Sequence, residues 1–253
     1  MIFVISGTQD GRELVEQLAA KGYPLIVSTA TAYGASLIES RENCQVFHQR
    51  LNRDQLMTFM DTHKVKLLID ATHPYAVEVS LNAIDACKHR KTPYIRFERS
   101  QSDDIGYQDI IYSVESYEEA AKYLSTIQGN ILLTTGSKTL EVFTNIIDRT
   151  RIFARVLPTC DVLKKCEVLG LPPSNIIAMQ GPFSKNMNKE MMKKYNIQLL
   201  VTKDSGDIGG TLDKLEAAHE MEVSVVMIMR PAIPYPNIYR SFSHIMDKVS
   251  EII

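Results

Sequence analysis

Short apolar segments alternate with helical patterns along the whole chain, and this alternation restricts the fold more than any other feature. The expected strands of the first half are residues 2–6, 24–28, 45–48, 66–70 and 93–97. The helical stretches among them are 11–21, 52–64 and 75–89. Because strand, helix and strand in succession are typical of parallel βαβ units, we predict a parallel α/β sheet.

The second half repeats the alternation without repeating the sequence. Its expected strands are residues 110–114, 131–134, 151–156, 175–179, 199–203 and 224–229. Helix starts are marked by two capping-box patterns and four N-cap candidates: Asn52 with Gln55, Ser116 with Glu119, and Ser137, Thr159, Ser184 and Thr211. The polar segment 98–109 separates the halves, which predicts one lobe over 1–98 and a second over 99–253. The proline-rich tail after Pro231 ends in a short amphipathic segment that is expected to pack on a lobe.

Composition excludes several classes of protein. With 45% hydrophobic and 23% charged residues, the chain has the composition of a globular protein. Its apolar stretches are shorter than the roughly 20 residues of a membrane helix, and no basic region precedes the apolar start, so export is not expected. A net charge of −2 argues against a protein that binds nucleic acid by neutralising many of its phosphates. The four cysteines contain no C-x-x-C pair and are interpreted as reduced packing residues of a cytoplasmic protein.

The carboxyl ends of parallel strands are where such folds bind ligands. After the first strand, Gly7 and Gly11 flank a turn into a helix, but Ser6 stands where G-x-G-x-x-G would have its first glycine. The turn is therefore either a phosphate-binding turn or an ordinary βα connection. At the end of the second strand, many dinucleotide-binding folds have an Asp or Glu that bonds a ribose hydroxyl, but this chain has Ser28 and Thr29. Their hydroxyls could equally be helix caps or cofactor contacts.

Two further strand ends carry chemistry-bearing residues. Asp70 is followed by Thr72, His73 and Pro74, and this position favours a functional histidine, as a hydrogen-bonding group or an acid. In the second half, TTGSK, GPFSKNMN and VTKDSGDIGGT place hydroxyls, amides and lysines at helix starts, which indicates an anion-receptive surface or, alternatively, ordinary caps. No P-loop, G-x-S-x-G or H-E-x-x-H motif is present, and no metal site is supported.

Several segments match one family in order and approximate spacing: SGTQDGRELVEQLAAKGY, IDATHPYAVEVSLNAIDAC, PYIRFERS, TTGSK, GPFS, LVTKDSG and VVMIMRP. On these segments the chain resembles the precorrin-6A reductase family of cobalamin biosynthesis, which includes the cobalt-precorrin-6A reductases. The resemblance covers nearly the whole chain. It implies an α/β protein of two Rossmann-like lobes with mostly parallel sheets, with NADH or NADPH and a modified tetrapyrrole bound in the cleft between them.

The resemblance also implies the site, residue by residue. The implied cofactor-binding residues are Gly7, Thr8, Arg12, Ser28, Thr29, Thr135 and Gly136. The implied substrate-binding residues are His73, Pro74, Tyr75, Lys203, Ser205 and Gly206, and His73 is also the candidate catalytic residue. The cations expected near either ligand are Arg96, Arg99, Lys138, Arg155, Lys185, Lys203 and Arg230. Two stretches depart from the family pattern: Ser6, and residues 49–55 where many relatives are rich in glycine.

The implied activity is nicotinamide-dependent reduction of precorrin-6A or cobalt-precorrin-6A to the corresponding 6B compound. A hydride goes to one carbon of the macrocycle, and water or His73 supplies a proton; positioning is the protein's main task. The expected partner is the tetrapyrrole, with no nucleic acid and no membrane. Two alternatives stay open: a two-lobed protein that binds an anionic ligand without chemistry, and a nicotinamide-dependent reductase of another substrate.

Overall fold

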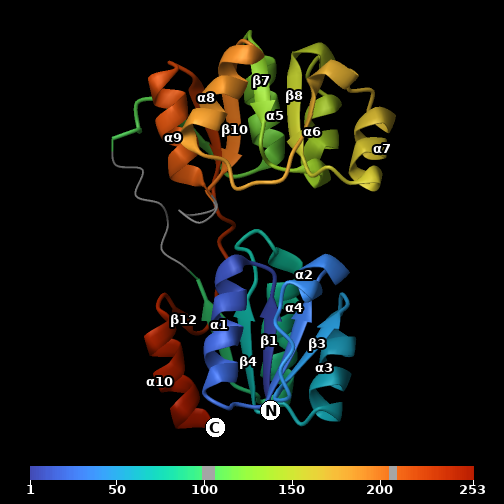
Figure 1. Ribbon diagram of the computed structural model, residues 1–253, viewed down its shortest axis with the longest axis vertical. Helices are drawn as coiled ribbons and strands as arrows, with labels where there is room; N and C mark the ends of the chain where they lie inside the picture. The colour runs from blue at the N-terminus through green and yellow to red at the C-terminus, as the bar shows by residue number, and fades with distance from the viewer. Residues whose placement is uncertain (99–105, 205–209) are drawn as a thin grey trace. The chain divides into compact units, whose positions relative to one another are not determined.

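The chain forms two compact units, which Figure 1 shows in the computed structural model. The structure describes residues 1–98, 106–204 and 210–253. Unit 1 consists of Met1–Ser100 together with Pro231–Ile253, and unit 2 consists of Gln101–Arg230. The predicted second lobe, 99–253, is therefore wrong at its far end, because the tail after Arg230 joins unit 1.

Unit 1 is built on a six-stranded sheet in which every strand pairs in parallel with its neighbours. The strand order is β12-β5-β4-β1-β2-β3. The strands are β1 (Ile2–Ser6), β2 (Leu25–Thr29), β3 (Cys44–His48), β4 (Leu67–Ala71), β5 (Tyr94–Phe97) and β12 (Ile238–Tyr239). The helices are α1 (Gln9–Ala20), α2 (Ala32–Ser36), α3 (Arg53–Thr62), α4 (Val77–Arg90) and α10 (Phe242–Ile252). Strand β12 comes from the end of the chain and completes the sheet beside β5.

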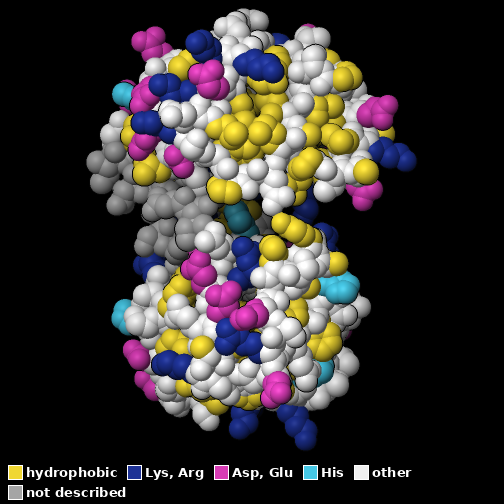
Figure 2. Space-filling model, in the orientation of Figure 1, with side chains coloured by type: hydrophobic (Ala, Val, Ile, Leu, Met, Phe, Trp, Pro, Cys, Tyr) yellow, Lys and Arg dark blue, Asp and Glu magenta, His cyan; other side chains and the backbone are white. Residues whose placement is uncertain are grey.

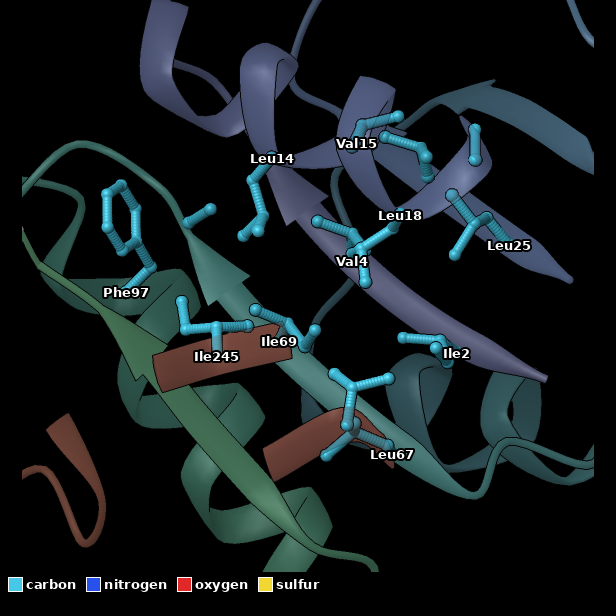
Figure 3. Packing of buried hydrophobic residues seen from close by; sticks show 14 of the residues in the cluster. Ile2, Val4, Leu14, Val15, Leu18, Leu25, Leu67, Ile69, Phe97 and Ile245 are labelled. Carbon is cyan, nitrogen blue, oxygen red and sulfur yellow. The ribbon is translucent and has the colours of Figure 1, made fainter. Parts of the chain in front are cut away.

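Both faces of this sheet are covered, which explains the nearly continuous apolar strands. Alternate residues of β1 contribute to two different cores: Ile2 and Val4 to one, Phe3 and Ile5 to the other. Figure 3 shows the first core, where side chains of β1 and β4 meet those of α1 and Ile245 of α10. The amphipathic tail expected to pack on a lobe therefore packs on unit 1.

Unit 2 has a second six-stranded, all-parallel sheet, in the order β6-β11-β10-β7-β8-β9. The strands are β6 (Ile111–Val114), β7 (Asn130–Leu133), β8 (Ile152–Val156), β9 (Ile176–Ala178), β10 (Ile197–Lys203) and β11 (Ser224–Ile228). The helices are α5 (Tyr117–Ser125), α6 (Leu140–Thr144), α7 (Cys160–Val168), α8 (Lys185–Lys194) and α9 (Thr211–Glu220). Short 3₁₀ turns lie at Ser137–Thr139, Arg149–Arg151 and Pro173–Asn175. Side chains of α8 and α9 pack in one core against β10 and β11.

The helix starts follow the sequence signals with some corrections. The capping box of Asn52 and Gln55 is formed in full. Ser116 caps α5, but the Glu119 carboxylate accepts from the Glu115 N–H instead of the N-cap N–H, so that box is incomplete. Ser184 caps α8 as expected.

Of the other three expected N-caps, Thr159 is confirmed in position, and Ser137 and Thr211 are wrong. Thr159 stands at the N-cap of α7 but makes no side-chain capping bond. Ser137 and Thr211 each lie one residue inside their helix, because Gly136 and Gly210 occupy the N-cap positions. Both glycines have positive φ angles, of 86° and 66°, which a serine or threonine adopts only at a cost.

Candidate active site

The turn between β1 and α1 holds the first candidate cofactor residues. Thr8 is the N-cap of α1: its Oγ1 accepts from the Gly11 N–H at 3.0 Å and donates to the Ala71 carbonyl at 3.3 Å. These bonds fix the start of α1 against the end of β4. Arg12 lies half-buried in the first turn of α1 and forms no ion pair with a described residue.

The same turn accommodates serine at position 6. A Cβ on Gly11 would lie 2.6 Å from the Ser6 Oγ and 2.8 Å from the Ala71 carbonyl oxygen, so this position has no room for a side chain. Nothing lies within 4 Å of a Cβ built on Gly7, so its backbone is open to a ligand. A close helix-to-strand contact and an accessible backbone are two properties of dinucleotide-binding turns.

Ser28 and Thr29, at the end of β2, are buried and hydrogen-bonded to nearby backbone. The Ser28 Oγ donates to the Gln49 carbonyl at 3.3 Å, and the Thr29 Oγ1 donates to the Thr31 carbonyl at 3.0 Å. Both hydroxyls thus shape the loops after β2 and β3. Each retains acceptor capacity for a ligand, so cofactor contact stays a prediction.

A buried polar cluster lies at the ends of β4 and β5. The Asp70 carboxylate, 1% exposed, accepts five hydrogen bonds. Their donors are the Thr72 N–H and Oγ1, the Ser80 Oγ, the Tyr94 hydroxyl and the Arg96 Nη1. Arg96 is opposite Asp70 in the strand register and is fully buried. The pKa of Tyr94 is raised, first by burial and then by the charge of Asp70.

The cluster holds the backbone that leads to His73. Because Asp70 binds both the N–H and the hydroxyl of Thr72, the residue before His73 is fixed. The Nδ1 of His73 accepts from the Tyr75 N–H at 3.3 Å, which leaves Nε2 as the nitrogen that carries the proton in the neutral ring. His73 and Tyr75 are half-buried with ring centroids 5.5 Å apart, and Pro74 between them is buried.

The cluster also corrects the role expected for Arg96. Its guanidinium bonds Asp70 at 2.9 Å and lies 4.7 Å from the ring centroid of Tyr235, on the segment that returns from unit 2. Arg96 is therefore an internal counter-ion that joins β4, β5 and the returning segment. The signal for this pair was present in the sequence, as opposite charges in the apolar strands LLID and YIRF.

In unit 2, Thr135 and Gly136 follow β7. The Thr135 Oγ1 lies 3.0 Å from the Thr139 Oγ1, so the two hydroxyls bridge the turn. Gly136 has a φ of 86° and open space where a Cβ would be. This turn therefore presents accessible backbone at a strand end, as the Gly7 turn does.

Lys203 ends β10 and is half-buried. Burial, and then the charge of Lys138, lowers the pKa of its ammonium group. The next residue, Asp204, forms an ion pair with Arg230 at 2.9 Å and also accepts from it through the backbone carbonyl. The charge of Asp204 thus ties the end of β10 to the residue that follows β11. Ser205 and Gly206, which complete this motif, lie outside the described residues.

The remaining expected cations differ in their partners. Lys185 pairs with Glu220 at 3.0 Å and with Glu216 at 3.4 Å, and Lys189 pairs with Glu220 as well. Such partly exposed pairs belong to a surface on which acidic and basic side chains alternate, as Figure 2 shows for one face. Arg99 lies outside the described residues.

Sequence reasoning missed a buried lysine in unit 2. Lys214, in the first turn of α9, is 7% exposed, and its Nζ donates to the Thr202 Oγ1 at 3.0 Å. Near it, Arg155 is 8% exposed, and its Nη1 donates to the Asn188 Oδ1 at 2.7 Å. The sequence held a signal for this, because Lys214 lies three residues after Thr211 and three before Ala217, both on the buried face of α9.

Cysteines and metal-ligand groups add little to the site. All four cysteines are free, and three are buried as the packing interpretation expects, but Cys160 is exposed. Among the described residues, no group of three or more His, Cys, Asp or Glu side chains is arranged to hold a metal ion. Within the same residues, no helix has the length and apolar composition needed to cross a membrane.

Two all-parallel sheets with open glycine turns and polar side chains at their strand ends define an α/β protein of two Rossmann-like units. The family model described as precorrin-6x reductase CbiJ/CobK matches residues 1–250. The chain therefore belongs to the precorrin-6x reductase family.

Relatives of known name support this assignment. The chain is 41% identical to the cobalt-precorrin-6A reductase of Priestia megaterium, over 97% of this chain and 96% of the relative. It is 34% identical to the cobalt-precorrin-6A reductase of Methanocaldococcus jannaschii, over 99% and 98% of the two chains. The solved structure of CobK precorrin-6A reductase has the same fold, with a TM-score of 0.82 and 22% identity over 99% of this chain and 96% of that one.

Proposed function

We propose that this protein reduces cobalt-precorrin-6A with NADH or NADPH in cobalamin biosynthesis. The observation that carries the proposal is the similarity over nearly the full length to relatives named cobalt-precorrin-6A reductase. We prefer the cobalt-containing substrate because both of these relatives carry that name.

When bound, NADH or NADPH would supply a hydride, and the protein would supply position and charge. The reduction would add that hydride to one ring carbon of the substrate and a proton to another atom, with one nicotinamide oxidised for each dihydro product. The residues of this chain must bring the two reacting carbons together, keep water away from them and hold the carboxylate arms of the ring.

The β1–α1 turn supports a cofactor site in unit 1. The open backbone at Gly7, the N-terminus of α1 after Thr8, and Arg12 would receive the pyrophosphate. In this proposal, Ser28 and Thr29 lie beside the adenosine ribose. No carboxylate follows β2, so NADH and NADPH are both retained as candidates.

Thr135 and Gly136 of unit 2 complete the proposed cofactor contacts, and the tetrapyrrole is assigned to the remaining candidates. His73, Pro74 and Tyr75 would line one part of its site, with Lys203, Ser205 and Gly206 in another. A tetrapyrrole with acetate and propionate arms is a polyacid, and a carboxylate near Lys203 would favour the charged ammonium that burial disfavours.

An anaerobic assay tests the proposal. Purified protein is mixed with cobalt-precorrin-6A and either NADH or NADPH, and the loss of nicotinamide absorbance is followed together with the mass of the tetrapyrrole. We expect oxidation of one nicotinamide per tetrapyrrole that gains two hydrogen atoms. Binding of the tetrapyrrole without any nicotinamide oxidation would support the alternative of a binding protein.

The role of His73 is tested by His73→Asn at saturating cofactor. If His73 donates the proton, kcat falls by about 10²- to 10⁴-fold and its pH dependence changes. His244→Asn on the exposed side of α10 is the matched control. A wild-type kcat and pH profile for His73→Asn would leave water as the proton donor.

For Lys203, we expect Lys203→Ala to raise the KM for the tetrapyrrole about tenfold with a smaller change in the KM for the cofactor. Lys193→Ala, an exposed lysine on α8, serves as the control. An unchanged tetrapyrrole KM would remove Lys203 from the substrate site.

A further inference from the structure

Unit 2 contains two buried cations whose charge no carboxylate of the described residues neutralises. Arg155 and Lys214 are 8% and 7% exposed, and neither forms an ion pair with a residue that the structure describes. Each has one neutral oxygen partner: the Asn188 Oδ1 at 2.7 Å for Arg155 and the Thr202 Oγ1 at 3.0 Å for Lys214. A guanidinium and an ammonium each carry more N–H groups than these bonds use, so further donors are left for a ligand.

The two cations belong to one region of unit 2. Arg155 lies near the carboxyl end of β8, and Thr202, the partner of Lys214, lies near the carboxyl end of β10. Arg155 reaches α8 through Asn188, while Lys214 comes from the first turn of α9, and these two helices share one core. The charges of Arg155 and Lys203 both lower the pKa of Lys214, in keeping with this common location.

Within the described parts of unit 2, the two carboxylates whose charge acts on Lys214 already have other partners. The Asp213 Oδ1 accepts from the Lys185 N–H at 3.0 Å, at the start of α8. Asp204 is paired with Arg230 at 2.9 Å. Both carboxylates raise the pKa of Lys214, but burial and the neighbouring cations outweigh them and lower it to about 7.

Burying a charge without a counter-ion is unfavourable, and apolar side chains of similar size would fill the same space more stably. Arg155 and Lys214 therefore weaken the unit unless an anion compensates them. Phe183, whose ring centroid lies 3.9 Å from the Arg155 guanidinium carbon, adds an apolar surface beside the charges. The guanidinium and the ammonium suit an anionic group, and the Phe183 ring offers an apolar contact for the short hydrocarbon arm that carries it.

We propose that Arg155 and Lys214 form an oxyanion subsite of unit 2 that binds one acetate or propionate carboxylate of the tetrapyrrole. This inference rests on the proposed function and names how its substrate is held. A phosphate of the cofactor has the same oxyanion chemistry, but the β1–α1 turn and Arg12 of unit 1 already provide for it. When the carboxylate binds, the Lys214 amine takes a proton from solvent and becomes the ammonium ion of the pair.

The test uses Lys214→Met, which removes the charge and keeps the length of the side chain, with Lys193→Met on the exposed face of α8 as the matched control. Binding of cobalt-precorrin-6A and of NADPH is measured separately by calorimetry at pH 8, in two buffers of different ionisation enthalpy. Circular dichroism shows whether each variant is folded. Arg155→Met is the second variant, in case the first does not fold.

We expect Lys214→Met to weaken tetrapyrrole binding about tenfold or more, to leave NADPH binding within about twofold, and to abolish the proton uptake that wild type shows on binding the tetrapyrrole. Unchanged tetrapyrrole affinity and unchanged proton uptake in a folded variant would overturn the subsite. Weakened binding of NADPH alone would overturn the carboxylate assignment in favour of a phosphate. Failure of the proposed function is recognised separately, because wild type would then not oxidise nicotinamide in the presence of the tetrapyrrole.

Discussion

The two units treat buried charge in opposite ways. In unit 1, Asp70 and Arg96 are both almost fully buried and bond each other at 2.9 Å, and three hydroxyls and a backbone N–H satisfy the rest of the carboxylate. In unit 2, Arg155 and Lys214 are nearly as buried, but their partners among the described residues are neutral: side-chain oxygens of Asn188 and Thr202, and for Arg155 also the Met191 sulfur and the Phe183 ring. The paired charges organise the protein itself, whereas the unpaired charges suit a ligand that brings the missing carboxylate.

The paired charges of unit 1 hold neighbouring parts of the protein in place. Asp70 fixes Thr72 and so places His73, while Arg96 contacts Tyr235 on the returning segment. Removing one partner of such a pair leaves the other buried and uncompensated. Replacing an uncompensated buried charge by an apolar side chain has the opposite effect on stability.

The largest expected effect comes from breaking the pair in unit 1. Asp70→Ala removes the closer of the two counter-ions of the buried Arg96 guanidinium and leaves Glu98, whose Oε2 lies 3.6 Å from the Arg96 Nε. We therefore expect a loss of about 3–5 kcal/mol in the free energy of unfolding. Urea unfolding at neutral pH measures it. The double variant Asp70→Ala/Arg96→Met should recover part of the loss. A loss below about 1 kcal/mol in the single variant would show that Asp70 does not compensate the buried charge of Arg96.

Lys214→Met should change stability in the other direction. Without ligand at neutral pH, we expect a gain of about 1–4 kcal/mol, because an apolar side chain replaces an uncompensated buried amine. Urea unfolding of both proteins, with Lys193→Met as control, measures the difference. A clear loss of stability would show that Lys214 is instead compensated within the protein.

The pH dependence of that difference has a definite sign. The pKa of Lys214 is lowered from 10.5 to about 7 in the folded protein, so between these values the unfolded chain binds the additional proton. The contribution of Lys214 therefore becomes less favourable as pH falls from 10 to 7, and is constant below that. The advantage of Lys214→Met over wild type should grow across this window, and a pH-independent difference would contradict the low pKa.

Glycine 11 gives a smaller effect. Gly11→Ala would place a methyl group 2.8 Å from the Ala71 carbonyl oxygen, so we expect a loss of about 1–3 kcal/mol from overpacking in unit 1. Gly7→Ala, with open space at its Cβ position, is the matched control and should change stability by less than about 1 kcal/mol. Thermal unfolding of the two variants measures the contrast, and equal effects would show that the close contact relaxes.

The smallest effect separates a bonded cap in unit 1 from an unbonded one in unit 2. Thr8→Ala removes a hydroxyl that accepts from Gly11, with an expected loss of about 1 kcal/mol. Thr159→Ala removes a hydroxyl that makes no capping bond, so its loss should be only a few tenths. Equal losses in the free energy of unfolding, measured with urea, would mean that the capping bond of Thr8 does not stabilise the protein.

Much of the secondary structure was predictable because its signals are local. All eleven expected strands are present, with ends within two residues of those expected. The hydrophobic alternation and the capping patterns depend only on residues a few positions apart. The short strand β12 was missed because its two residues carry no pattern. It forms because its backbone pairs in parallel with that of β5.

The candidate site was predictable in part. The polar strand ends at Gly7, Ser28 and His73 stand out in the sequence, and the structure places each at the carboxyl end of a parallel strand. Arg96 was assigned to a ligand although it is the partner of Asp70. The opposite charges in LLID and YIRF were visible in the sequence, but that β4 and β5 are neighbours which place these two residues opposite each other came only from the structure.

The sequence by itself determined the alternating strands and helices, the family motifs and the residue types at the strand ends. Only the tertiary structure decided which charges meet, which unit receives the tail after Arg230, and that Lys214 is buried beside Arg155 without a carboxylate partner among the described residues. The physical reason is that periodicity is a property of adjacent residues, whereas the partner of a buried charge depends on strand order, register and helix packing, which join residues far apart in the chain.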